Sequence, residues 1–89
     1  MQTASYNGAI EIKMRLEDRQ KFVRLANRRV TNAIKAIQLV GNLSNRSNYD
    51  YSDADVNKII KALQDELGAC KKRFEMASKS SVNKKFSLE

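Results

Sequence analysis

The sequence has no histidine, proline or tryptophan, one cysteine and three glycines in 89 residues. Without histidine there is no histidine base and no Ser-His-Asp triad. A single cysteine without histidine cannot build a zinc site, and it cannot close a disulfide within the chain. Because proline is absent and glycine is scarce, few residues oppose a helix, and a mostly helical chain is favoured.

Long apolar runs and glycine-rich phosphate loops are also missing. No stretch approaches 18 apolar residues, so we expect no membrane span, and the first residues lack the basic and apolar regions of a signal peptide. A cytoplasmic protein without a membrane partner is therefore predicted. Polar residues spaced like part of a calcium loop are Asp50, Asp53, Asp55 and Asn57. Because Lys58 and Gln64 stand where that loop needs Gly and Glu, we expect no calcium site there. Together with the missing histidine and phosphate loop, this predicts no metal, no cofactor and no enzyme activity.

Apolar residues recur at spacings of three and four in two stretches, as along one face of a helix. The first seam comprises Val23, Ala26, Val30, Ala33, Ile37 and Val40. The second seam comprises Val56, Ile60, Leu63, Leu67, Cys70 and Phe74. A polar connection joins the two, which predicts an all-α fold, an antiparallel helical hairpin, as one domain over residues 1–89.

Local signals set the expected bounds of both helices. The first helix is predicted to start by Glu17 or Asp18, whose charges suit a helix N-terminus, and to end at Gly41 as a left-handed cap. Ser52 and Asp55 fit a capping box that opens the second helix. That helix is predicted to end near residue 77.

The predicted helical core comprises residues 9–77, and a terminal segment flanks it on each side. Residues 1–8 are predicted to be a loose terminus and residues 78–89 a basic tail, whose Leu88-Glu89 ending is typical of an expression-vector scar. Ile10 to Leu16 alternate apolar and polar residues, which matches a strand that pairs between two copies. The same residues are good helix formers, so a helix extension stays open as the alternative.

The two seams are predicted to pair small side chains with larger ones. The expected pairs are Val40 with Val56, Ile37 with Ile60, Ala33 with Leu63, Val30 with Leu67, Ala26 with Cys70, and Val23 with Phe74. Cys70 is accordingly interpreted as a small buried residue rather than a nucleophile or ligand.

A second row flanks each seam. In the first helix it comprises Phe22, Leu25, Arg29, Asn32, Ala36 and Leu39. In the second it comprises Ile59, Ala62, Glu66, Ala69, Arg73 and Met76. Arg29 and Glu66 are predicted to lie at one level as an ion pair. Either residues 9–16 fold over this row, or two copies meet there as a four-helix bundle; because the segment is short, we expect a homo-oligomer.

Positive charge is concentrated in one part of the chain. There are 17 Lys and Arg against 10 Asp and Glu, and no acidic residue lies between Arg19 and Tyr49. Cations predicted to share the face opposite the first seam are Lys21, Arg24, Arg28 and Lys35, and the hairpin would bring Lys71, Lys72 and Arg73 beside them. Two interpretations stay open: a footprint for a phosphate backbone, or a solvated helix face. Without aromatic side chains on this face, binding would be weakly sequence-specific.

The connection from Gly41 to Tyr51 is the second candidate site. Its recognition residues would be Asn42, Asn45, Arg46, Asn48, Tyr49 and Tyr51. The alternative is that its Asn and Ser side chains cap the chain reversal while the tyrosines pack beneath it.

Two resemblances bear on function. The run FVRLANRRVTNAIKAIQLVGNLSNRSNYDYSDADVNKIIKAL resembles short uncharacterised helical proteins of bacteriophages and bacterial mobile elements, which implies an accessory role and no site residues. IEIKMRLED followed by two helices is similar to ribbon-helix-helix repressors, which implies a dimeric ribbon in the DNA major groove. That resemblance would turn Glu11, Lys13 and Arg15 toward the bases, although the first helix is far too long for the family.

These patterns predict a non-enzymatic, small, basic binding protein that contacts the nucleic-acid backbone. The alternative is a protein-binding inhibitor or adaptor, such as an anti-defence factor. It would bind an acidic surface of a host protein through the basic face, or bind its target through the loop.

The predicted seam makes Leu63 a test position. If the seam is closed by a partner helix, Leu63→Ala should lower the free energy of unfolding by about 2–5 kcal/mol. A thermal melt measures this loss, and a melting temperature that the substitution leaves unchanged would contradict the pairing.

Overall fold

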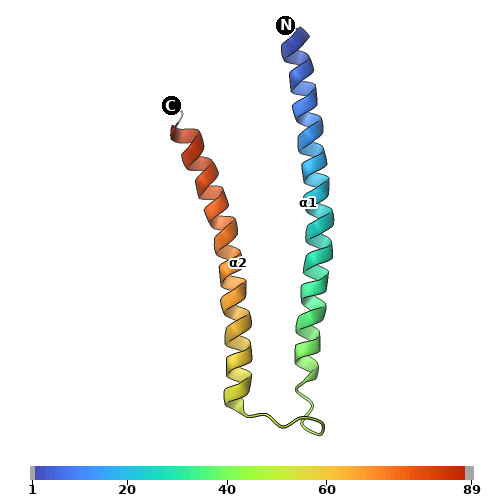
Figure 1. The fold of residues 1–89 in the computed structure, drawn as a ribbon, viewed down its shortest axis with the longest axis vertical. Coiled ribbons are helices and arrows are strands. Elements are labelled where there is room, and N and C mark those ends of the chain that lie inside the picture. The colour runs from blue at the N-terminus through green and yellow to red at the C-terminus, as the bar shows by residue number, and fades with distance from the viewer. Residues whose placement is uncertain (1, 88–89) are drawn as a thin grey trace. The chain divides into compact units, whose positions relative to one another are not determined.

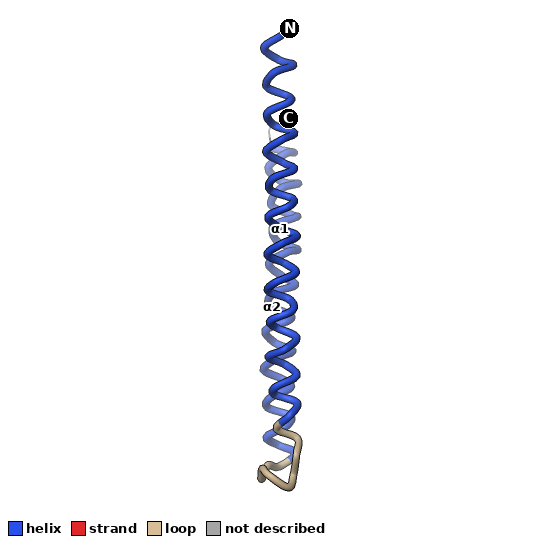
Figure 2. Tube along the Cα trace, turned by 90° about the vertical axis from the view of Figure 1, so that its right-hand side faces the viewer, coloured by secondary structure: helices blue, strands red, loops and turns tan. Residues whose placement is uncertain are grey.

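Two long helices and one loop make up the described chain. The structure, a computed structural model, describes the backbone of residues 2–87 and the side chains of residues 11–79. Helix α1 spans Gln2–Asn42, helix α2 spans Asp53–Ser87, and residues 43–52 connect them (Figure 1). Residues 2–87 contain no strand (Figure 2), which confirms the predicted all-α class.

The helices belong to two structural units, Met1–Tyr49 and Asp50–Glu89. The predicted hairpin pairs residues of one unit with residues of the other, and so does the predicted ion pair between Arg29 and Glu66. Both therefore stay predictions, whereas the course of each helix is observed.

Helix α1 begins much earlier than Glu17. Residues 9–16 are helical, so the strand alternative is wrong for this segment, and so is the strand implied by the ribbon-helix-helix resemblance. The physical reason is that Glu11, Lys13, Met14 and Leu16 are strong helix formers, and an isolated strand leaves its backbone groups unpaired. The helix also includes residues 2–8, whereas Met1 lies outside the described residues.

The end of α1 differs from the predicted glycine cap. Gly41 does not have a positive φ, and the helix continues to Asn42. The last carbonyls are instead satisfied by tighter turns, because Leu43 N–H donates to the Val40 carbonyl at 3.0 Å and Ser44 N–H donates to the Gly41 carbonyl at 3.0 Å. Such i to i+3 bonds are a common way to close a helix without a left-handed residue.

The start of α2 is the predicted capping box. Ser52 N–H donates to Asp55 Oδ2 at 2.9 Å, and Asp55 N–H donates to Ser52 Oγ at 3.2 Å. Val56 N–H donates to the Ser52 carbonyl at 3.2 Å, which closes the first helical turn. The reciprocal bonds satisfy two donors that a helix start leaves open, so residue 52 fixes where α2 begins.

The far end of α2 extends beyond the predicted limit. The helix continues past Ala77 to Ser87, so the predicted end was too early. Without proline or glycine between residues 78 and 87, nothing in the sequence forces the helix to stop there. Leu88 and Glu89, interpreted as a vector scar, lie outside the described residues.

Apolar side chains remain accessible along both helices. None of the side chains described, residues 11–79, is buried; the most enclosed, at intermediate exposure, are Leu25, Ala26, Val40, Tyr51 and Leu63. Seam residues Val30 and Ile37 are 56% and 53% exposed. Cys70, predicted to be buried, is exposed in α2, because its own helix offers nothing to cover it.

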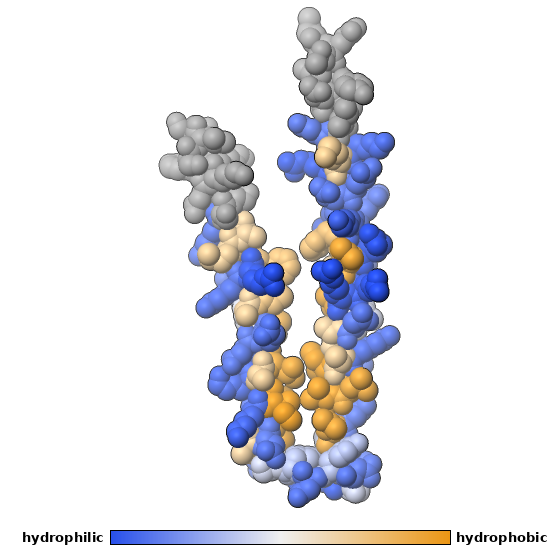
Figure 3. Space-filling model, in the orientation of Figure 1, coloured by the Kyte–Doolittle hydropathy of each residue, from blue (hydrophilic) through white to orange (hydrophobic). Residues whose placement is uncertain are grey.

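Each seam has the period of a coiled coil. Spacings of three and four alternate without interruption from Val23 to Val40 and from Val56 to Phe74, an average near 3.5 residues. In α1 the seam alternates a branched residue with alanine from Val23 to Ile37 and then ends at Val40, and alanine lets a partner helix approach closely. Among the side chains described, the most hydrophobic surface of each helix lies toward the loop (Figure 3).

Gly41 tests how α1 ends. A Cβ added at Gly41 or at Gly68 has no atom within 4 Å, so Ala fits at both positions. Because alanine favours the helical backbone, Gly41→Ala and the matched Gly68→Ala should each stabilise the chain by about 0.5–1 kcal/mol.

Thermal melts followed by circular dichroism at 222 nm measure both variants. Gly68→Ala serves as the mid-helix control. If Gly41→Ala lowers the melting temperature while Gly68→Ala raises it, the helical conformation described for Gly41 is wrong.

Candidate nucleic-acid interface

Four cations of α1 form one exposed face, here called the basic face: Lys21, Arg24, Arg28 and Lys35. With about 100° between successive residues, they fall within a sector of roughly 60° on the side opposite the first seam. Lys21 and Lys35 are about 21 Å apart along the helix axis. The helix alone therefore brings these predicted site residues together.

The charge of the basic face is largely uncompensated within its own helix. No Asp or Glu lies within four residues of Arg24, Arg28 or Lys35, and only Lys21 has carboxylates one turn away, at Glu17 and Asp18. Helix side chains form ion pairs chiefly at separations of three and four residues. The positive potential of this face is therefore available to a partner.

Uncharged polar side chains lie beside the cations along α1. They are here called the polar row: Gln20, Asn27, Thr31 and Gln38. All four are exposed, and helical spacing places them on one edge of the basic face. The pattern of charges alone does not reveal this row. The same three-and-four spacing applied to Asn, Gln and Thr finds it.

Helix α2 has a different outer face. There Lys58, Lys61, Asp65 and Glu75 mix both signs, and Lys61 Nζ lies 2.9 Å from Asp65 Oδ2. The two side chains of this pair are 75% and 67% exposed. Pairs so exposed contribute little stability, so this face is that of an ordinary solvated helix.

The predicted cations of α2 do not form a second such face. Lys71, Lys72 and Arg73 are consecutive, so they project in directions about 100° apart. Only one of them can lie on any single face of α2. Their association with Arg24 depends on the hairpin and is not set by either helix alone.

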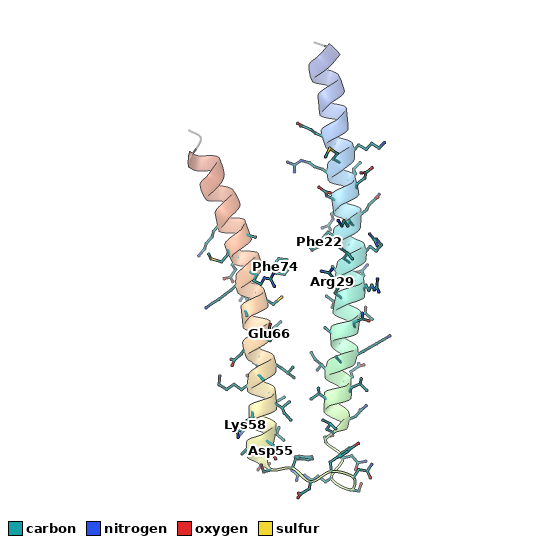
Figure 4. The ribbon with its side chains drawn as sticks, in the orientation of Figure 1. Phe22, Arg29, Asp55, Lys58, Glu66 and Phe74 are labelled. Atoms are coloured by element: carbon teal, nitrogen blue, oxygen red, sulfur yellow. The ribbon has the colours of Figure 1, made fainter. Side chains whose placement is uncertain are left out.

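The second row is exposed in the same way as the seam. Phe22 is 50% exposed, and the guanidinium carbon of Arg19 lies 5.8 Å from the centre of its ring. Leu25 and Ala36 follow Phe22 along α1, and in α2 the row contains Ile59, which is 38% exposed. Figure 4 shows Phe22 and Arg29 on α1 and Glu66 on α2, each extending from its own helix.

Asn45 organises the loop. Its side-chain Oδ1 accepts hydrogen bonds from Ser47 N–H at 3.1 Å and from Ser47 Oγ, and its carbonyl accepts from Asn48 N–H at 3.1 Å and Tyr49 N–H at 3.0 Å. An Asn side chain that bonds the backbone two residues on is a turn-forming device. This arrangement supports a structural role for Asn45.

The tyrosines of the loop differ in exposure. Tyr49 is 50% exposed, whereas Tyr51 is partly buried. Arg46 and Tyr51 both have interaction partners in the structure. Tyr49 is consequently the more accessible of the two rings, on a backbone that Asn45 holds.

Asp55, in the first turn of α2, has a carboxyl group whose pKa is shifted. The pKa of its carboxyl is lowered from 3.8, first by the hydrogen bond from Ser52 N–H and second by the bond with the Ser52 side chain. Both bonds favour the ionised form. Figure 4 shows Asp55 in the first turn of α2, next to the loop, with Lys58 further along the helix.

Neither a metal-binding cluster nor a membrane-spanning stretch is present among the described residues. No group of three or more His, Cys, Asp or Glu there is arranged to hold a metal ion. Neither helix, over its described part, has a stretch long and apolar enough to cross a membrane.

Comparison with protein-family models, curated proteins and solved structures found no match to this chain.

The capping box predicts a specific pH dependence. Because the pKa of Asp55 is lowered in the folded chain, the stabilisation by its carboxylate is present above the pKa of the unfolded chain. That stabilisation is lost as pH falls through the lowered folded-state pKa. The amide resonance of Ser52, followed by NMR during an acid titration, should therefore report a pKa below 3.8.

Asp55→Asn is the control, because an amide still accepts the Ser52 bond but does not ionise. In that variant the Ser52 resonance should lose the titration. A Ser52 resonance that titrates like an ordinary aspartate in the parent chain contradicts the capping geometry.

Proposed function

We propose that this chain is a non-enzymatic binding protein whose basic face contacts the phosphate backbone of a nucleic acid. The observation that carries the proposal is the arrangement of Lys21, Arg24, Arg28 and Lys35 on one side of α1, three of them with no carboxylate within a helical turn. Lys and Arg that neutralise phosphates release condensed counterions, which drives binding without sequence readout. An accessory role in a phage or mobile element is part of this proposal.

The fold that presents the basic face is proposed to be an antiparallel hairpin. Both seams share one period, and the connection between the helices is short, so an intramolecular partner is at high effective concentration. Pairing would cover Val30 and Ile37, which are each more than half exposed in their helix. It would also add Lys71, Lys72 and Arg73 of α2 to the cationic end of the molecule.

The second row leads us to propose self-association. A hairpin uses one apolar row of each helix and leaves Phe22, Leu25 and Ile59 accessible. Two hairpins that join through this row would form a four-helix bundle, in which Arg29 and Glu66 are complementary charges. The outward basic face of α1 is not used by either contact, so both copies could bind nucleic acid.

One observation favours a second candidate, a protein-binding inhibitor or adaptor. Tyr49 is half exposed in a loop in which three backbone N–H groups, those of Ser47, Asn48 and Tyr49, donate to Asn45. A rigid tyrosine costs little conformational entropy on binding, which is why tyrosine is frequent at interface hot spots. The basic face would serve the same candidate if the host protein presents an acidic surface.

A salt series tests the nucleic-acid proposal. Binding of the full chain to a generic 30-base-pair duplex should fall steeply as salt rises. Removing two cations with Lys21→Ala and Lys35→Ala should lower the slope of log K against log salt by about 2, since each duplex phosphate contact contributes about 0.9. Fluorescence anisotropy measures both quantities.

The matched control is the double variant Lys58→Ala and Lys61→Ala. It removes the same formal charge from the solvated face of α2, so its slope should stay close to that of the parent. Equal loss in both double variants means that net charge, and not the basic face, drives binding. No binding at low salt leaves the inhibitor or adaptor as the better account.

A further inference from the structure

The outer faces of the two helices differ in a way that net charge does not explain. The outer face of α1 combines cations with amides and has no carboxylate from Gln20 to Gln38, whereas that of α2 mixes Lys with Asp and Glu. A solvated face gains from mixed signs, since opposite charges one turn apart support the helix. The uniform face of α1 lacks that support, which points to a ligand that matches it.

Given the nucleic-acid binding proposed for the basic face, on which this step rests, we propose that the ligand is B-form duplex DNA and that α1 lies in its major groove. An α-helix with side chains is about 10–12 Å across, and the major groove is about 12 Å wide. Helix α1 is unbroken from Gln2 to Asn42, so it presents an uninterrupted rod to the groove.

Four residues at the centre of the face occupy positions i, i+3, i+4 and i+7: Arg24, Asn27, Arg28 and Thr31. They form one continuous patch over two turns, and each is exposed. Arg pairs with the acceptors of guanine, and Asn pairs with the acceptor and donor of adenine, in both cases from the major groove. The patch therefore contains the two side-chain types that read base edges best.

The two lysines flank this patch. Lys21 lies before Arg24 and Lys35 after Thr31, about 21 Å apart along the axis. A straight helix leaves the curved groove beyond both ends of the central patch, so the two ammonium groups lie where the flanking phosphates are within reach while the centre faces the bases. Phosphate contacts at the ends then set the register for base contacts in the middle.

Other nucleic acids fit this face less well. Double-stranded RNA has a major groove too deep and narrow for side chains to read, and it is bound across its minor groove instead. Single strands are held by stacking on aromatic rings, and the centre and flanks of this face contain no aromatic residue. The geometry thus selects a DNA duplex.

Competition between duplexes tests the inference with the full chain. A 30-base-pair DNA duplex should bind more tightly than an RNA duplex of the same sequence at equal salt. Protein bound to DNA should protect guanine N7, in the major groove, from dimethyl sulfate and leave adenine N3, in the minor groove, reactive. Selection from a pool of DNA duplexes with a random centre should enrich adenine-containing sites.

Asn27→Ala supplies the specificity test. Alanine favours a helix more than asparagine does, so the fold is retained. The variant should lose about 5- to 150-fold discrimination at one base pair of the selected site, while its salt slope stays unchanged. The matched control is Asn57→Ala, which removes the same side chain from an exposed position of α2 and should leave selection unaltered.

The outcomes separate this inference from the proposed function. Equal affinity for DNA and RNA duplexes, or adenine N3 protection in place of guanine N7, overturns major-groove binding and leaves backbone binding intact. If Asn27→Ala selects the same DNA sites with the same discrimination as the parent chain, the proposed role of Asn27 is overturned. If the chain binds neither the DNA duplex, nor the RNA duplex, nor the pool of DNA duplexes at low salt, the proposed function itself is overturned.

Discussion

An isolated amphipathic helix in water exposes its apolar row, and only a second apolar surface removes that exposure. Both helices of this chain are in that condition: Val30, Ile37 and Leu67 are more than half exposed. Hydrogen bonds along the backbone cannot compensate, since helical stability in proteins comes mostly from packing of the apolar face. Every further property, including which faces stay free for a partner, depends on how the seams are covered.

Local chemistry explains which features of the fold were predictable. The capping box at Ser52 and Asp55 involves residues three apart, so its geometry follows from the sequence without knowledge of the rest of the chain. The face shared by Arg24 and Arg28 follows in the same way from helical periodicity. Both signals are contained within one or two turns.

The wrong predictions came from patterns with two explanations. Ile10 to Leu16 alternate like a strand, yet five of these seven residues are strong helix formers, and no edge is available to pair with a strand. Gly41 resembled a cap because glycine often ends helices, but short i to i+3 bonds close α1 equally well. The pairing of the seams could not be derived further, because it depends on contacts between residues far apart in the chain.

The fixed start of α2 has a consequence for how such a chain can vary. Ser52 sets the first turn, so residues added to or removed from the connection before it leave the phase of α2 unchanged. A single residue inserted inside either helix instead rotates everything beyond it by about 100° and turns apolar positions to the solvent side. Length polymorphism among descendants of this sequence should therefore concentrate between residues 43 and 51, leaving both helical repeats in frame.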